Sequence, residues 1–218
     1  MILRPKPLFA IAVLGALSFI ALLTPGGQAM AADNGWLRGS CASGTGTYRW
    51  ADGTRYEGQC RGNYFEGQGT LYLNNGDRYE GQFSNDQKNG RGTYYFANGD
   101  RFEGTFRNGR RNGPGTLLRA NGDRYEGNYS NDQRSGRGTF YFANGDRYEG
   151  NWSADRLDGQ GTYYFANGDQ YSGQWRAGQK HGRGTFTWAN GNRYEGNFSN
   201  DQRNGDRKST RLNSSHYS

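Results

Sequence analysis

The chain contains little of what an ordinary globular core or a catalytic site requires. Hydrophobic residues make up 32% of its 218 residues, and few of those after residue 31 are Leu, Ile or Val. This scarcity excludes an aliphatic core for most of the chain. Histidine occurs only at His181 and His216, and no serine has a histidine and a carboxylate at a spacing typical of a catalytic triad. The sequence therefore indicates a protein that is not an enzyme and holds no cofactor.

A long apolar run is also missing outside the N-terminus. The single run, Leu8 to Leu23, is shorter than the about 20 residues that a membrane-spanning helix needs. Arg4 and Lys6 precede it and the small-residue site Ala29-Met30-Ala31 follows it, an order typical of a signal peptide. We predict that residues 1–31 are removed and that the protein is exported to the periplasm or the extracellular space. The alternative is an uncleaved N-terminal anchor.

What the chain has instead is glycine and aromatic residues in a strict repeat. Glycine accounts for 37 residues and aromatic residues for 15%. A unit of 23 residues repeats from Tyr56 to Gly205 without an insertion or a deletion. Each unit opens with an aromatic residue, has glycine two places later, and has a second aromatic residue, or once cysteine, two places after that. The opening residues are Tyr56, Tyr79, Phe102, Tyr125, Tyr148, Tyr171 and Tyr194, and the second column is Cys60, Phe83, Phe106, Tyr129, Trp152, Trp175 and Phe198.

The pattern Y-x-G-x-[aromatic]-x6-G-x-G-x6-G resembles the MORN repeat family, and with the signal peptide it resembles an exported bacterial member. The resemblance implies β-hairpin repeats and a scaffold, protein-binding or membrane-associated role. One column departs from the family, which usually has glycine three places after the second aromatic residue, as at Gly109 and Gly178. Asn and Asp also tolerate the left-handed backbone of a tight loop, so the hairpin expectation stands. The departing residues are Asn63, Asp86, Asp132, Asp155 and Asp201.

The period divides the chain into four parts. After the signal peptide, residues 32–55 form a degenerate unit, because its second half aligns with the later units while its first half has lost the pattern. Such a unit is typical of the cap of a repeat stack. Residues 56–205 are six full units and a truncated seventh.

Residues 206–218 break the pattern between one residue and the next. The period demands Arg or Gln, then Gly and Thr, but the chain reads Asp206-Arg207-Lys208-Ser209-Thr210. Codons for this segment resemble a common short-read sequencing adapter, whereas the alternative is a native polar terminus. We predict that residues 206–218 are non-native and disordered, and that the natural protein continues the unit. The strand at Arg193 to Phe198 would then be an uncapped edge and invite self-association.

The segment Ala97-Asn98-Gly99 decides which residues share a face. A two-residue Asn-Gly turn would place Tyr94 and Phe102 on opposite faces of a hairpin. A three-residue loop ending in a left-handed Gly99 pairs Tyr94 with Phe102, Gly92 with Gly104 and Thr93 with Glu103. This pairing separates an aromatic face of rings and glycines from a polar face of Arg, Thr, Glu and Tyr. We predict the three-residue loop. The expected fold is all-β, an elongated single-layer antiparallel sheet of stacked hairpins.

Gly92 and Gly104, opposite each other on the aromatic face, should open a slot in which a neighbouring ring lies. Each ring buries ~150–250 Å², so rings replace the missing aliphatic core. The predicted structural residues are Tyr79, Gly81, Phe83, Gly90, Gly92, Gly99, Tyr125, Gly127, Tyr148, Gly150, Trp152, Tyr171, Gly173 and Trp175.

Neither aspartate nor cysteine points to a metal site. The aspartates after the turn glycine would lie ~9–10 Å apart, too far for calcium, so we interpret them as turn residues with a local arginine partner. They are Asp77, Asp100, Asp123, Asp146 and Asp169. The two cysteines, Cys41 and Cys60, are an even pair in an exported protein, which favours a disulfide between them.

Basic residues recur near the connection at Ser84 to Asn89, which should be long and should lie with its equivalents along one edge of the sheet. One interpretation is a binding rail for an acidic protein partner or an anionic membrane or cell-wall surface. The alternative is a solvated edge, which interspersed aspartates support. Part of the formal net charge of +7 belongs to residues 1–31 and 206–218, so the array is only mildly basic and nucleic acid is not expected. The candidate binding residues are Lys88, Arg91, Arg110, Arg111, Arg134, Arg137, Lys180 and Arg183.

We therefore expect a non-enzymatic, exported repeat scaffold that mediates protein–protein or membrane-surface interaction. One alternative is a cell-wall or glycan-binding module, because exposed tyrosines and tryptophans on a sheet suit sugar rings. Another is the repeat region of a longer enzyme. The exposure of Trp152, Trp175 and Trp188 distinguishes the scaffold from the glycan binder.

Overall fold

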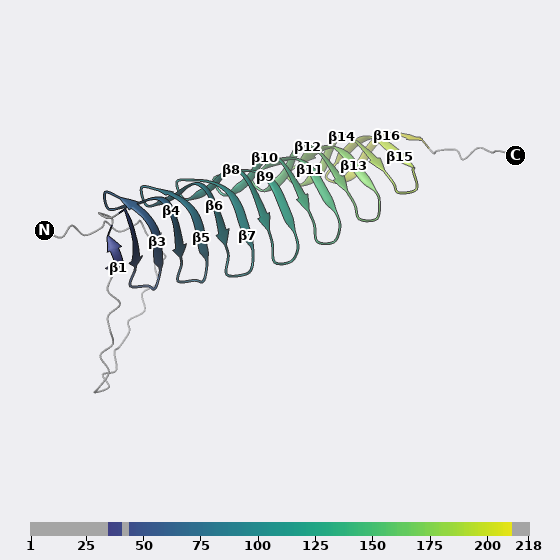
Figure 1. The fold of residues 1–218 in the computed structure, drawn as a ribbon. Coiled ribbons are helices and arrows are strands. Elements are labelled where there is room, and N and C mark those ends of the chain that lie inside the picture. The colour runs from purple at the N-terminus through teal and green to yellow at the C-terminus, as the bar shows by residue number, and fades with distance from the viewer. Residues whose placement is uncertain (1–34, 41–43, 211–218) are drawn as a thin grey trace, which may run out of the picture.

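The computed structural model describes residues 35–40 and 44–210, which form one antiparallel sheet of 16 strands. Every strand pairs with its neighbours in sequence, so the order in the sheet is the order in the chain. Figure 1 shows the result as an elongated, twisted stack of hairpins with β1 at one end and β16 at the other. Within these residues, no helix has the length and hydrophobicity needed to cross a membrane.

The strands alternate between seven and nine residues through the repeats. Their bounds are β1 Gly35–Ser40, β2 Thr45–Arg49, β3 Arg55–Arg61, β4 Tyr64–Tyr72, β5 Arg78–Ser84, β6 Gln87–Tyr95, β7 Arg101–Arg107, β8 Arg110–Leu118, β9 Arg124–Ser130, β10 Gln133–Tyr141, β11 Arg147–Ser153, β12 Arg156–Tyr164, β13 Gln170–Arg176, β14 Gln179–Thr187, β15 Arg193–Ser199 and β16 Gln202–Thr210.

The three-residue loop predicted at Ala97-Asn98-Gly99 is confirmed. The Phe96 N–H donates to the Asp100 carbonyl at 2.9 Å, and Gly99 has a φ of 90°. Tyr94 then pairs with Phe102, as the face argument required. Because the side-chain period of a strand is two, this register places rings and glycines on the aromatic face of every hairpin.

The second connection is shorter than predicted. Ser84 pairs with Gln87, so only Asn85 and Asp86 form the turn, with φ values of 49° and 65°. Positive φ at both positions is typical of a type I′ hairpin turn, which Asn, Asp and Gly accept. The departing residues Asn63, Asp86, Asp132, Asp155 and Asp201 all have positive φ, so they replace the glycine of the family as expected.

A bulge follows this turn and explains a second glycine column. Gly81 pairs with Gly92 and Phe83 with Lys88, so β6 carries more residues than β5 between these pairs. Gly90, within the excess, has a φ of 96°, which L side chains rarely adopt. Gly90 is therefore required by the backbone rather than by a ring slot.

The rings lie in slots over the other two glycine columns. A Cβ built on Gly92 would collide with the Tyr79 ring, and one on Gly81 would lie 2.6 Å from the Tyr79 hydroxyl oxygen. The hydroxyl donates to the Gln82 carbonyl at 3.0 Å, which holds the ring along its own strand. The slot is thus the pair Gly81 and Gly92, across the Asn-Asp turn, and not Gly92 with Gly104.

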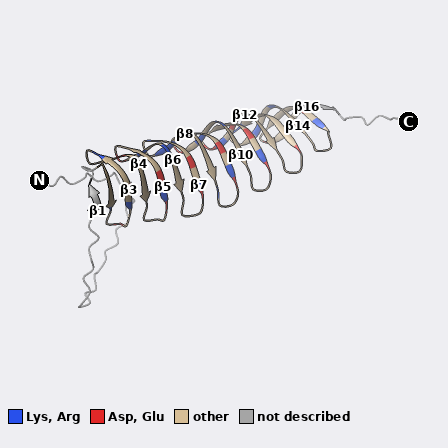
Figure 2. Ribbon diagram, viewed as in Figure 1, with Lys and Arg blue, Asp and Glu red and all other residues tan. Residues whose placement is uncertain are grey.

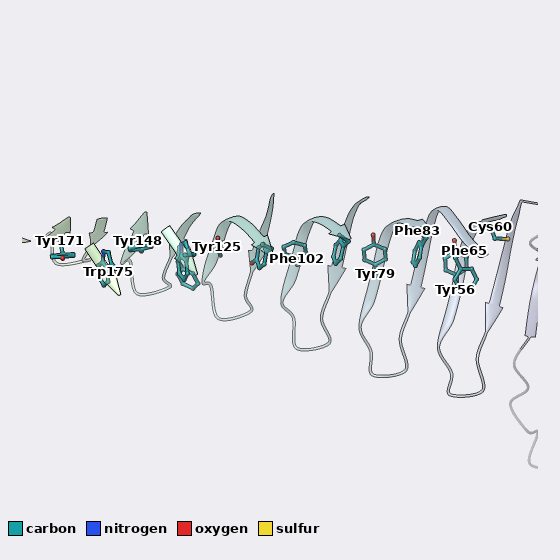
Figure 3. Packing of buried hydrophobic residues seen from close by; sticks show 14 of the residues in the cluster. Tyr56, Cys60, Phe65, Tyr79, Phe83, Phe102, Tyr125, Tyr148, Tyr171 and Trp175 are labelled. Carbon is teal, nitrogen blue, oxygen red and sulfur yellow. The ribbon is translucent and has the colours of Figure 1, made fainter. Parts of the chain in front are cut away.

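These rings join into a continuous ladder along the stack, whose row is visible in Figure 3. Phe83 contacts Tyr56 and Tyr79 edge-on at centroid distances of 5.1 and 5.2 Å, and Tyr79 contacts Phe106 at 4.9 Å. The same zigzag continues through every later unit to Tyr194. Both aromatic columns are buried, including the predicted Tyr125, Tyr148, Trp152, Tyr171 and Trp175.

The prediction that residues 206–218 are disordered is wrong for residues 206–210. They belong to β16, which pairs with β15 so that Glu195 faces Lys208 and Arg193 faces Thr210. Ladder hydrogen bonds come from the backbone, so the strand continues without the side chains of the repeat. The C-terminal edge of the described sheet is consequently β16 and not Arg193 to Phe198. Residues 211–218 lie outside the described residues.

The signal peptide and Cys41 also lie outside the described residues, so cleavage and the disulfide stay predictions. Cys60 is buried in the second aromatic column and forms no disulfide with any residue that the structure describes. Its backbone N–H donates to the Gly44 carbonyl at 3.0 Å. The strand β1 forms the first half of the degenerate unit and pairs with β2 across a bulge between Trp36 and Arg38.

Candidate functional site

The aspartates after the turn glycine link each turn to the next one. Asp77 Oδ1 accepts a hydrogen bond from the Ala97 N–H at 2.8 Å, and its Oδ2 accepts one from the Tyr94 hydroxyl at 2.7 Å. The same backbone contact joins Asp100 to Ala120, Asp123 to Ala143, Asp146 to Ala166 and Asp169 to Ala189. These carboxylates therefore hold neighbouring turns together. In the described part of the chain, no three His, Cys, Asp or Glu side chains gather as metal ligands would.

Hydrogen bonds change the acidity of some of these carboxylates. Burial raises the pKa of Asp77, but the bonds from Tyr94, Ala97 and Asn75 outweigh it and hold that pKa below its usual value. In Asp123, the bond from the Ala143 N–H is the largest influence and also lowers the pKa. The folded stack thus favours the ionised form of Asp77 and of Asp123.

Four of the predicted basic residues lie on the aromatic face, where they cover rings. Lys88 Nζ is 4.5 Å from the centroid of the Tyr94 ring, and the Arg134 guanidinium is 4.3 Å from the centroid of Trp152. Each such contact contributes about 0.5–2 kcal/mol. Arg111, Lys180 and Arg203 occupy the same column and lie over Tyr129, Tyr171 and Tyr194.

Aspartates of the next turn bind most of these cations. Arg134 Nε lies 3.0 Å from Asp155 Oδ1, and the pairs Arg111–Asp132 and Lys180–Asp201 are equivalent. Lys88 differs, because Gly109 stands where the others have aspartate. Within the described residues Lys88 has no carboxylate at ion-pair distance, and burial lowers its pKa, against the opposing effect of Asp132 and Asp77. This cation column is engaged in holding the stack.

The remaining basic residues lie elsewhere. Arg91, Arg137 and Arg183 pair with residues of the polar face, and Arg110 is exposed beside its turn. Figure 2 shows basic and acidic segments interspersed along successive hairpins. The eight predicted residues therefore do not line one edge, and the structure does not form the rail that the sequence indicated.

The polar face instead carries a groove of about 990 Å³ that crosses β3 to β9. Its floor is the glycine row of the ring slots, seen from the opposite side of the sheet. One wall alternates glutamate and threonine from strand to strand, in the order Glu57, Thr70, Glu80, Thr93, Glu103, Thr116 and Glu126. The other wall is irregular and includes Gln68, Arg91, Thr105, Pro114 and Asn128.

Each glutamate of the regular wall is held from behind by an arginine two residues earlier. Arg78 Nε lies 3.1 Å from Glu80 Oε1, and its guanidinium covers the Tyr95 ring at 4.2 Å. The arrangement recurs at Glu57, Glu103 and Glu126 with Arg55, Arg101 and Arg124. These pairs are half-exposed, so they fix the carboxylates in place more than they stabilise the fold.

Sequence reasoning placed Thr93 and Glu103 opposite each other on the polar face, which is confirmed. It did not identify the groove, because the groove depends on the bend that the bulge introduces in each hairpin. The signal in the sequence is the recurring Gly90 column. It marks a positive φ in the strand interior, where bulges occur.

The three tryptophans Trp152, Trp175 and Trp188 are not available for sugar rings. Trp152 and Trp175 are buried, and their Nε1 atoms donate to the carbonyls of Gly138 and Gly161 at 3.2 Å. Trp188 is partly buried and packs on Phe186 at a centroid distance of 4.9 Å. These three described tryptophans therefore do not support the glycan-binding alternative.

A family model described as the MORN repeat matches the chain from residue 42 to residue 205. It matches eight successive segments, and the boundaries of the complete units coincide with those read from the sequence. The segments are 42–55, 56–78, 79–101, 102–124, 125–147, 148–170, 171–193 and 194–205.

Among solved structures, the chain is similar to the TCP domain of Drosophila melanogaster SAS-4 (dCPAP) in complex with a proline-rich motif of Ana2 (dSTIL). The identity is 15%, the match covers 81% of this chain and 97% of that one, and the TM-score is 0.46. The TCP10 domain of Danio rerio CPAP with a peptide of STIL is 13% identical, covers 75% and 89%, and has a TM-score of 0.32. Values this low give no information on the function of this chain. Comparison with curated protein sequences found no match.

Proposed function

Because the chain belongs to the MORN repeat family, we propose that it is a non-enzymatic scaffold that binds a protein partner along the polar groove. The observation that carries this proposal is the groove itself, which crosses seven consecutive strands and is walled by polar side chains. A concave surface with a few ordered polar groups is where binding sites usually lie.

The aromatic face is a poorer candidate for the binding surface because its rings and cations already make contacts within the stack. Its rings are buried against one another, and its cations lie over those rings. A partner on this face would have to displace internal contacts of the stack. On the polar face, a partner would displace only water from half-exposed side chains.

The scaffold would act outside the cytoplasm. This part of the proposal rests on the signal-peptide pattern of residues 1–31. N-terminal sequencing of the protein recovered from the periplasm or culture medium tests it. A mature chain beginning at Ala32 is expected, and an intact Met1 in the membrane fraction would contradict the proposal.

Partner capture by groove variants tests the binding function. Thr93→Arg combined with Thr116→Arg places two long side chains in the groove, while Thr162→Arg alters the same column on β12, outside the groove. Affinity capture should recover a partner with the unchanged protein and with Thr162→Arg, but not with the double variant. A partner that binds all three equally would show that the groove is not the binding surface.

A further inference from the structure

The regular wall of the groove has a repeat distance that a ligand can match. One glutamate recurs per hairpin, at Glu57, Glu80, Glu103 and Glu126. A hairpin contributes two strands at ~4.8 Å each, so successive glutamates lie ~9.6 Å apart. Any ligand that lies along the groove meets a carboxylate at this interval.

A polyproline II helix repeats at nearly the same distance. It has three residues per turn and rises ~3.1 Å per residue, so one side of it recurs every ~9.3 Å. Over the three intervals between Glu57 and Glu126, the mismatch accumulates to only about 1 Å. An extended β-strand presents one face every ~6.6 Å, and two turns of an α-helix rise ~10.8 Å, so both fall out of step.

The carboxylates can accept a further cation. Arg101 Nη2 binds Glu103 Oε2 at 2.6 Å, and within the described residues no donor contacts Glu103 Oε1. The second oxygens of Glu57 and Glu126 are likewise without a donor in the described part. Glu80 differs, because its Oε2 accepts a hydrogen bond from the Tyr95 hydroxyl at 3.4 Å. At Glu57, Glu103 and Glu126 the neighbouring arginine leaves one carboxylate oxygen free to accept. A Lys or Arg of a ligand would complete the pair as a charge-assisted hydrogen bond.

The threonines between the glutamates suit the backbone of such a ligand. Thr70, Thr93 and Thr116 each present a hydroxyl that can donate or accept, half a hairpin from the nearest carboxylate. A polyproline II chain has no internal hydrogen bonds, so its carbonyl groups need partners of this kind. The regular wall thus offers a cation site and a backbone site within each repeat.

We propose that the occupant of the polar groove is an extended polypeptide in the polyproline II conformation with Lys or Arg at every third residue. The inference rests on the proposed function, since it names the chemistry of the partner that binds the groove. Arg91 lies on the opposite wall and would repel a basic peptide locally. That wall is irregular, so its side chains do not recur at the spacing of a repeating ligand, and the glutamates of the regular wall determine the charge that is preferred.

Peptide titration against the full chain tests the inference. The probes are a labelled (Lys-Pro-Pro)4 peptide, a peptide with the same residues but the four lysines adjacent, and (Glu-Pro-Pro)4. Fluorescence anisotropy should show the tightest binding for (Lys-Pro-Pro)4. The variant Glu80→Gln with Glu103→Gln should weaken that binding about tenfold, because it removes two exposed ion pairs.

A matched control separates charge in the groove from charge elsewhere on the polar face. Glu149→Gln with Glu195→Gln removes the same column on β11 and β15, where the carboxylates also pair with arginines but lie outside the groove. This control should bind (Lys-Pro-Pro)4 as the unchanged protein does. Equal melting temperatures of the two double variants would show that neither effect comes from unfolding.

Three results would overturn the inference: equal binding of the clustered-lysine peptide, preference for the acidic peptide, or equal weakening by both double variants. None of them bears on the proposed function, which is tested by partner capture with the threonine variants. If capture depends on the groove but (Lys-Pro-Pro)4 does not bind, the groove binds a protein of another chemistry. If capture does not depend on the groove, the proposed function itself fails.

Discussion

Substituting a slot glycine tests the basis of the fold directly. Gly127 has a φ that alanine can adopt, so Gly127→Ala adds one methyl group without backbone strain. A Cβ at this position would lie 2.6 Å from Tyr125 Cζ and 2.6 Å from Gly138 Cα. Both distances are far below a normal carbon contact, so the Tyr125 ring must move.

The cost follows from what the ring touches. Tyr125 contacts Tyr129 and Trp152 edge-on, each at 5.3 Å, and its hydroxyl donates to the Asn128 carbonyl at 3.1 Å. Overpacking a core costs about 1–3 kcal/mol, and each ring contact contributes about 0.5–1.5 kcal/mol. We expect Gly127→Ala to lower the free energy of unfolding by about 3 kcal/mol. Glu126→Ala, one residue away on the polar face, should cost about 0.5 kcal/mol, because its pair with Arg124 is exposed.

Urea unfolding of the full chain, followed by tryptophan fluorescence, measures both variants. A double-mutant cycle then identifies the cause. In a Tyr125→Ala background, which lacks the ring, the loss of unfolding free energy caused by Gly127→Ala should be smaller by at least about 1 kcal/mol. Equal unfolding midpoints for Gly127→Ala and Glu126→Ala would refute the face assignment. Additive effects of the Gly127 and Tyr125 substitutions would refute the slot.

Four further predictions concern the turns, the cysteines and the edges. Asp123 has a pKa below its usual value in the folded protein, so its ionised carboxylate stabilises the fold at any pH above the unfolded-state pKa of about 3.9. This stabilisation is lost as the pH falls through the lower folded-state pKa. Acidification below about pH 4 should therefore lower the unfolding midpoint of the unchanged protein more than that of Asp123→Asn. Gly109→Asp should raise stability by about 0.5–1 kcal/mol, measured by the same titration, because aspartate is accepted at this positive φ in other units and would give Lys88 a partner. Intact mass with and without reductant should reveal a Cys41–Cys60 disulfide, and two free thiols in the exported protein would contradict it. Light scattering should show concentration-dependent association through open sheet edges, whereas a strict monomer at high micromolar concentration would count against it.

The fold could be predicted from the sequence because the length of one turn determines the pairing of the strands. The loop at Ala97 to Gly99 sets the register, and the register sets both faces of every unit that shares it. The buried columns then follow from a period of two along each strand. The second turn was misjudged because Gln87 and Lys88 look polar, although polar residues pair in a ladder as well as any others.

The placement of the basic residues could not be read from charge alone. Lys88 and Arg134 look like exposed loop residues, yet both lie on the aromatic face. The period did contain the signal, since the same column holds Phe65 and Leu157 in two other units. A column that alternates between cations and apolar residues is typical of a position against rings, where long basic side chains cover apolar surface.

The sheet is one layer thick, so the glycine row borders both the ring slots of the aromatic face and the groove of the polar face. Only the aromatic face requires glycine at these positions. A Cβ at Gly81 or Gly92 would meet the Tyr79 ring, so it would point to the aromatic face and leave the groove unfilled. Glycine at these positions is therefore demanded by packing and not by a ligand. In the proposed scaffold, ligand specificity would come from the residues on either side, such as Glu80 and Thr93, which alternate to the polar face. Stability and binding can accordingly vary independently in this chain: the ring ladder holds the stack, while the groove wall can change its chemistry from repeat to repeat without disturbing a buried contact.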